Sequence, residues 1–144
     1  MAKQRINPTQ IRNDHRWRVY ASAGIAMNTG LPIAVFNSKN YDPLNMYSTS
    51  TGKVTIIASG LYMITARMSA AAAARSFLNI VPSVSQGMRG SDFGNNAEGT
   101  GSIVSAPIYL QAGETVHITA YCAASATSEF GENLAFFSGA LIGT

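Results

Sequence analysis

The stretch LAFFSGALIG at residues 134–143 indicates how the chain folds, because it is apolar on two sides. Alternate side chains of an extended strand point to opposite faces, so Phe136 and Ile142 face one way while Phe137 and Leu141 face the other. A sheet in a two-layer sandwich needs only its inner face to be apolar. The second apolar face therefore predicts cover by another subunit, and hence an oligomer.

The rest of the chain also reads as short strands. Clusters of Gly, Pro, Asn and Ser interrupt it at short intervals, and the runs between them are rich in Val, Ile, Tyr, Phe and Thr. Strands are predicted at residues 18–22, 33–37, 53–58, 61–69, 76–84, 103–111, 114–123 and 135–142. Turns are predicted at residues 24–32, 39–45 and 111–114.

An alanine run, SAAAAAR at residues 69–75, is the one stretch that favours a helix, because alanine is the best helix former. One helical turn fits there. The residues on either side read better as strands, so a tight connection between two strands is the preferred interpretation.

The composition indicates a single domain with little charge on its surface. The chain has 144 residues, enough for one core. Charged residues make up 12% of it, about half the usual share. A surface so poor in charge indicates that other chains cover part of it.

All of the net positive charge lies in the first 18 residues. They hold five Lys or Arg and one Asp, which gives a net charge of +4, whereas the remaining 126 residues have a net charge of −1. The leader is either a solvated tail or an arm that docks on an acidic surface of a partner protein. It lacks a dense basic run, so nucleic acid is not an expected partner. Trp17 would fix the leader to the head, either within the core or across a subunit boundary.

The sequence contains no pattern that predicts catalysis, a cofactor or a metal centre. Cys122 is the only cysteine, so no disulfide forms within the chain, and it is predicted to be buried. His15 and His117 lie far apart, and the sequence lacks a nucleophile motif such as G-x-S-x-G. We therefore expect no enzymatic activity and no cofactor.

Two pairs of acidic residues lie in Gly-rich segments where calcium could bind. They are Asp92 with Glu98, and Glu129 with Glu132. Neither pair has the spacing of an ordered calcium loop, so solvated turns are expected. The start of the chain lacks the apolar core of a signal peptide, and no run reaches the length of a membrane span.

Four segments in a fixed order resemble the C1q/TNF superfamily. They are AVFNSKNYDP at residues 34–43, KVTIIASGLYMITARMS at 53–69, APIYLQAGETVHITAYCAAS at 106–125 and LAFFSGALIG at 134–143. The matching residues are Phe36, Asn37, Tyr41, Asp42, Gly60, Tyr62, Leu110, Ala112, Gly113, Glu114, Phe137, Ser138, Gly139, Leu141 and Ile142.

This resemblance implies an all-β, ten-stranded jelly-roll sandwich that forms a homotrimer, with both chain ends near the base of the trimer. The chain then divides into an extended N-terminal arm at residues 1–17 and a C1q-like head at residues 18–144. Six residues are predicted to lie in the trimer interface or the core: Tyr62, Tyr109, Tyr121, Phe136, Phe137 and Leu141.

The missing collagen repeat and signal peptide make the chain similar to the C1q-like domains of bacteriophage virions and of some bacterial surface proteins. The preferred hypothesis is a non-enzymatic virion protein, made in the host cytoplasm, that decorates the capsid or forms a short head fibre. Its arm would bind a capsid or other virion protein through Lys3, Arg5, Arg12, Arg16 and Trp17. The alternative is the receptor-binding or carbohydrate-binding head of a phage tail fibre or bacterial surface protein, which would bind a host-surface glycan. No membrane partner is expected.

Overall fold

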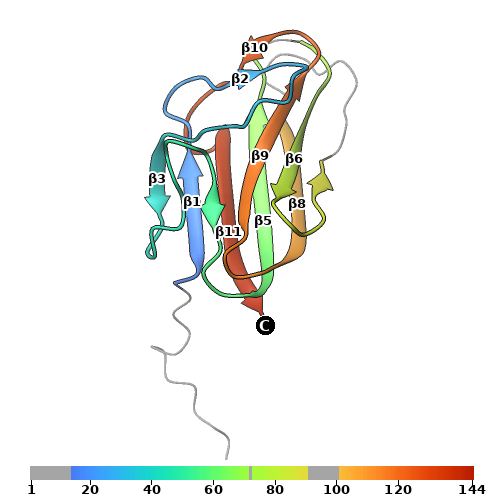
Figure 1. Ribbon diagram of the computed structural model, residues 1–144. Helices are drawn as coiled ribbons and strands as arrows, with labels where there is room; N and C mark the ends of the chain where they lie inside the picture. The colour runs from blue at the N-terminus through green and yellow to red at the C-terminus, as the bar shows by residue number, and fades with distance from the viewer. Residues whose placement is uncertain (1–13, 72, 91–100) are drawn as a thin grey trace, which may run out of the picture.

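Two antiparallel sheets face each other in the computed structural model, which describes residues 14–71, 73–90 and 101–144 (Figure 1). The first sheet has five strands in the order β3-β1-β11-β5-β8. These strands are β1 (Arg16–Tyr20), β3 (Ser38–Tyr41), β5 (Gly60–Ser69), β8 (Gly101–Leu110) and β11 (Ala135–Gly143). The chain enters β1 and leaves β11 at the same end of this sheet, because Arg16 pairs with Ala140.

The second sheet has four strands in the order β4-β9-β6-β7. They are β4 (Val54–Thr55), β6 (Ser76–Pro82), β7 (Met88–Arg89) and β9 (Thr115–Cys122). A small third sheet pairs β2 (Ala26–Met27) with β10 (Ala126–Thr127), at the end of the sandwich opposite to the C-terminus (Figure 1). This arrangement confirms the predicted all-β jelly-roll sandwich.

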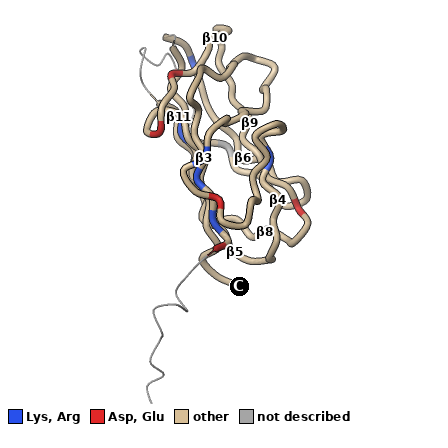
Figure 2. Tube along the Cα trace, turned by 90° about the vertical axis from the view of Figure 1, so that its left-hand side faces the viewer, with Lys and Arg blue, Asp and Glu red and all other residues tan. Residues whose placement is uncertain are grey.

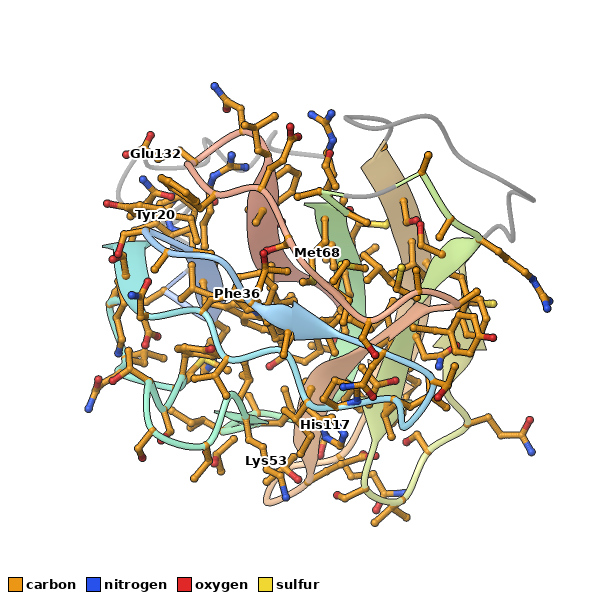
Figure 3. The ribbon with its side chains drawn as sticks, turned by 90° about the horizontal axis from the view of Figure 1, so that it is seen from above. Tyr20, Phe36, Lys53, Met68, His117 and Glu132 are labelled. Carbon is orange, nitrogen blue, oxygen red and sulfur yellow. The ribbon has the colours of Figure 1, made fainter. Side chains whose placement is uncertain are left out.

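An aromatic cluster fills one part of the core between the sheets. The Phe137 ring meets the Trp17 ring edge-on at 5.5 Å between centroids, and it also contacts the rings of Phe36 and Tyr47. Trp17 in turn contacts Tyr62 at 6.1 Å. The view from above shows Phe36 enclosed by the sheets (Figure 3). Side chains from distant parts of the sequence thus hold β1, β5 and β11 together.

The turn after β3 explains why an Asp follows Tyr41 in the chain. The Asp42 carboxylate accepts hydrogen bonds from the backbone N–H groups of Met46 and Tyr47 and from Lys39 Nζ. This fixes Tyr47 so that its hydroxyl accepts a hydrogen bond from the Phe36 N–H at 2.7 Å. Burial raises the pKa of Tyr47 to about 12, although the Phe36 N–H acts in the opposite direction.

The long predicted strands agree with the structure, and two shorter predictions need correction. Residues 33–37 do not form a strand, because only Ile33 makes an isolated bridge there, to Thr119; the strand next to β1 is β3, part of which was predicted as a turn. In the predicted strand at 53–58, only Val54 and Thr55 form a strand, β4. Within the described residues of the alanine run, no helix forms.

Candidate subunit interface

The outer face of the five-stranded sheet carries exposed apolar side chains on three adjacent strands. We call this set the apolar face, and its members are 36–54% exposed: Leu61, Met63, Ile103, Tyr109 and Ile142. Strand register places Leu61 beside Tyr109 and Met63 beside Pro107, whereas Ile103 lies further along β8, where it pairs with Arg67. Adjacent apolar side chains on a sheet surface mark a protein contact more strongly than scattered ones do.

Two arginine side chains lie on the same outer face, on β1 next to the edge strand β3. The Arg18 guanidinium lies over the Phe136 ring at 4.3 Å, and its Nη2 donates a hydrogen bond to the carbonyl oxygen of Glu132. Arg16 lies over the Tyr41 ring at 5.1 Å. Figure 2 shows Lys and Arg positions in a column on the side of β3 and β11. The face therefore combines an apolar area with a basic, aromatic area.

The six residues predicted for the interface or core divide into three groups. Tyr62 and Phe137 are fully buried in the core, and Leu141 is partly buried against it. Tyr109 and Phe136 lie on the outer face of the five-stranded sheet. Tyr121 lies on the other sheet, where its ring stacks on Phe77 at 4.5 Å. Only Tyr109 of the six belongs to the apolar face.

Four members of the apolar face were missing from the predicted set: Leu61, Met63, Ile103 and Ile142. The sequence did contain a signal for Leu61 and Met63. In LYMITARM at residues 61–68, buried side chains alternate strictly with more exposed ones along β5. Tyr62 and Ile64 point inward and Leu61 and Met63 point outward, so both sides of this strand are apolar at its lower end. The argument that identified the last strand also applies here.

The residues predicted for the arm fall on both sides of the first described position. Lys3, Arg5 and Arg12 lie outside the described residues. Arg16 and Trp17 belong to β1, so the strand begins two residues earlier than predicted. Trp17 is fully buried in the core of its own chain, and a Cβ at Gly139 would overlap its ring. This overlap explains why glycine follows Phe137 and Ser138 in the last strand.

A buried carboxylate at the lower end joins two loops. The carboxylate of Glu114 accepts hydrogen bonds from the backbone N–H groups of Val84, Ser85 and Gln111 and from the Ser85 hydroxyl, at 2.7–3.0 Å. Burial acts to raise the pKa of Glu114, but these four donors outweigh it and lower the pKa below its ordinary value of 4.5. The preceding Gly113 has a φ of 89°, which favours glycine in this turn. All of the donors come from the protein, so Glu114 has a structural role.

Groups that could support other chemistry are dispersed. In residues 14–71, 73–90 and 101–144, no three His, Cys, Asp or Glu side chains are placed to hold a metal ion. Asp92 and Glu98 of the predicted calcium segments lie outside the described residues. Burial and, to a smaller extent, the charge of Lys53 lower the pKa of His117, which keeps it neutral at pH 7 (Figure 3). The described part of the chain has no helix with the length and hydrophobicity to cross a membrane.

The two facing sheets, the buried aromatic cluster and the apolar outer face define a jelly-roll head of the C1q/TNF type. The C1q domain model matches residues 19–142, and the chain belongs to this family. C1q/TNF-like domains are non-enzymatic binding modules, which confirms the expectation that the chain is not an enzyme.

Solved structures show the same fold at low sequence identity. The globular domain of zebrafish complement 1qA protein has 20% identity and a TM-score of 0.69, over 91% of this chain and 98% of that one. Eiger TNF from S. frugiperda has 12% identity and a TM-score of 0.65, over 91% and 94%. Murine APRIL has 6% identity and a TM-score of 0.65, over 88% and 98%. No curated protein sequence matches the chain.

Proposed function

We propose that the chain forms a homotrimer through the outer face of its five-stranded sheet. The observation that carries this proposal is the apolar face, whose five side chains are exposed on adjacent strands although most of the sheet's inner side chains are fully buried. The face also presents two dissimilar areas, one apolar around Tyr109 and one basic around Arg16 and Arg18. Dissimilar areas suit the head-to-tail contacts of a cyclic trimer. The family resemblance implies the same oligomer.

The proposed trimer is a non-enzymatic structural protein of a virion, either a capsid decoration or a short head fibre, which the N-terminal arm attaches. The positive charge of the leader supports this role, because Lys3, Arg5 and Arg12 precede the head in a segment, residues 1–13, that contains no Asp or Glu. The position of β1 also supports it, since its first residue, Arg16, lies at the same end of the sheet as the C-terminal strand's end. An arm that leaves from one end can bind a surface while the rest of the head projects.

Deletion of residues 1–13 tests the attachment role. The cut stays clear of Asp14 and His15, whose carbonyl oxygens accept hydrogen bonds from the N–H groups of Arg16 and Leu141. The shortened protein should keep its melting temperature and its mass of about three times 15.2 kDa, but should no longer co-sediment with purified particles. Added salt should weaken the full-length protein's binding, because exposed ion pairs are screened over about 8 Å at physiological ionic strength. Continued co-sedimentation of the shortened protein would place attachment in the head.

A receptor-binding or glycan-binding head is the second candidate, and one observation favours it. Phe77 and Tyr121 stack on the outer face of the four-stranded sheet, and Arg75 lies 5.9 Å from both rings. This surface stays free if the other sheet forms the trimer. Tyr121 gives this surface an aromatic ring with a polar hydroxyl, a combination that is enriched at binding interfaces. A glycan array that compares the wild type with Tyr121→Ala therefore discriminates between the candidates.

A further inference from the structure

The upper end of β5 and the beginning of β8 bring three residues together on the outer face of the five-stranded sheet. Ser69 pairs with Gly101, and Arg67 precedes Ser69 by two residues on the same face of β5. A Cβ at Gly101 would lie 2.6 Å from Arg67 Nε, 3.2 Å from Arg67 Nη2 and 3.1 Å from Ser69 Oγ. The absence of a side chain at Gly101 therefore lets a guanidinium edge and a hydroxyl approach the same point.

The Ser69 hydroxyl is an unusual group for this position. Ser69 is fully buried, and its Oγ has no hydrogen-bond partner among the described residues. Elsewhere in the same region, the buried hydroxyls of Ser76 and Ser102 bond to each other at 2.8 Å. Most buried polar groups have a partner, because leaving one without costs about 1–3 kcal/mol. A buried donor without a protein acceptor points to a ligand atom.

Arg67 has donors to spare beside this hydroxyl. Its Nη1 donates to the carbonyl oxygen of Asn133 at 2.7 Å, which fixes the guanidinium in place. Its Nε and Nη2 form the side-on pair of donors nearest to Gly101. Lys39 has a carboxylate partner, Asp42, at 2.8 Å, whereas no ion pair joins Arg67 to a carboxylate of the described residues. The guanidinium is thus oriented, half-exposed and charged.

We propose that Arg67, Ser69 and Gly101 form a binding site for a carboxylate. The two parallel donors of a guanidinium edge match the two oxygens of a carboxylate, and the Ser69 hydroxyl supplies a third donor. Arg18 adds a second positive charge on the other side of Phe136, the residue that pairs with Arg67. Gly101 is required because any side chain there would displace the Arg67 edge.

Glu129 sets the strength of this site. Its backbone N–H donates to the carbonyl oxygen of Ser69 at 2.7 Å, so its backbone adjoins the residue that supplies the hydroxyl donor. A negative charge close to the site repels a carboxylate ligand. Glu129→Gln should therefore strengthen ligand binding, whereas a site unrelated to anions would not respond.

The experiment is an NMR titration of the full-length protein with sodium acetate, against sodium chloride at matched ionic strength. Acetate should produce a saturable shift of the Arg67 Nε–H signal. Ser69→Ala should weaken acetate binding by about tenfold or more, since a hydrogen bond to a charged group is lost, and Gly101→Ala should abolish it. Ser105→Ala is the matched control, because Ser105 lies on the same face of β8 and bonds to Thr65 instead.

Two results would overturn the proposal: a wild-type shift that does not saturate, or Ser69→Ala binding acetate as tightly as the wild type. A second variant tests whether one chain holds the whole site. All three residues come from one chain, so Tyr109→Asp, designed to separate the subunits, should still bind free acetate. Loss of acetate binding in that variant would overturn the assignment of the site to one chain. This outcome is separate from the oligomer test, which measures mass.

Discussion

The outer faces of the two sheets differ in how far contacts within the chain cover their side chains. On the four-stranded sheet, the Asn79 amide donates to the Thr119 hydroxyl at 3.1 Å, and the rings of Phe77 and Tyr121 cover each other. On the five-stranded sheet, the apolar face has no such cover in the described part of the chain, and Tyr109 is 54% exposed.

This difference shows that the sandwich is complete on one side only. Hydrogen bonds between neighbouring strands and paired rings let the four-stranded sheet face water at little cost. Apolar side chains exposed on adjacent strands gain free energy when another surface removes them from water, at roughly 25 cal/mol per Å². The five-stranded sheet is therefore the side from which assembly is expected.

The largest expected loss of stability comes from a substitution in the core rather than on either outer face. Phe137→Asp places a carboxylate among the rings of Trp17, Phe36 and Tyr47, which costs several kcal/mol because none of these side chains carries a positive charge to neutralise it. The variant should fail to fold, as measured by circular dichroism. Phe136→Asp, one residue away on the outer face, should remain folded. A folded, monomeric Phe137→Asp protein would mean that this ring belongs to the interface.

The second prediction compares the two outer faces directly. Tyr109→Asp should weaken subunit association roughly a hundredfold or more while each chain stays folded, because a carboxylate would enter a dry contact. Val81→Asp is the matched control on the four-stranded sheet and should leave association unchanged. Light scattering across a dilution series measures both. Equal dissociation by the two variants would remove the distinction between the faces.

A smaller effect concerns Glu114, which lies at the base and belongs to neither face. Glu114→Gln should cost about 1–3 kcal/mol, because it removes the charge from a group with four donors. The pKa of Glu114 is lowered on folding, so its contribution is present above pH 4.5 and disappears as the pH falls through the lowered value. Denaturant melts from pH 7 to pH 2 should show this loss in the wild type and a flatter profile in the variant.

The smallest expected effect is that of a chelator. Because the sequence predicts no structural metal ion, a chelator should change the melting temperature by less than ~5 °C, which corresponds to roughly 1–2 kcal/mol for a chain of this size. Differential scanning fluorimetry with and without added calcium measures it. A larger shift would show that acidic segments such as the one with Glu129 and Glu132 hold calcium.

The sequence predicted the long strands because their signals are local. Strands β5, β6, β8, β9 and β11 lie within about two residues of their predicted ends. Their β-branched and aromatic composition and their turn residues depend only on neighbours in the chain. Residues 33–37 were predicted as a strand for the same reasons, but only isolated backbone bonds, such as Ala34 N–H to Ile118 O, form there. A strand forms only where a neighbouring strand is available for pairing, and the local composition of the chain does not indicate whether one is.

The sequence predicted that an exposed apolar face exists, but it did not predict most of the residues that form it. An uncovered apolar face was expected from LAFFSGALIG alone. Of the residues predicted for the interface or the core, Tyr62 and Phe137 lie in the core, and the predicted set lacked Leu61, Met63, Ile103 and Ile142. The Arg67–Ser69–Gly101 site had no signal in the sequence. Arg67 and Ser69 lie two positions apart on β5, but Gly101 follows Ser69 by 32 positions on β8, and only the register between the two strands brings the three together.

The sequence by itself determined that the last strand has two apolar faces, because alternation along a strand is a property of its own backbone. Only the tertiary structure decided that Phe137 faces inward and Phe136 outward. That choice depends on the opposite sheet, since the ring that meets Trp17, Phe36 and Tyr47 is the one that the second sheet can cover. Two adjacent phenylalanines with the same chemistry thus have different roles, because burial is a property of the assembled layers.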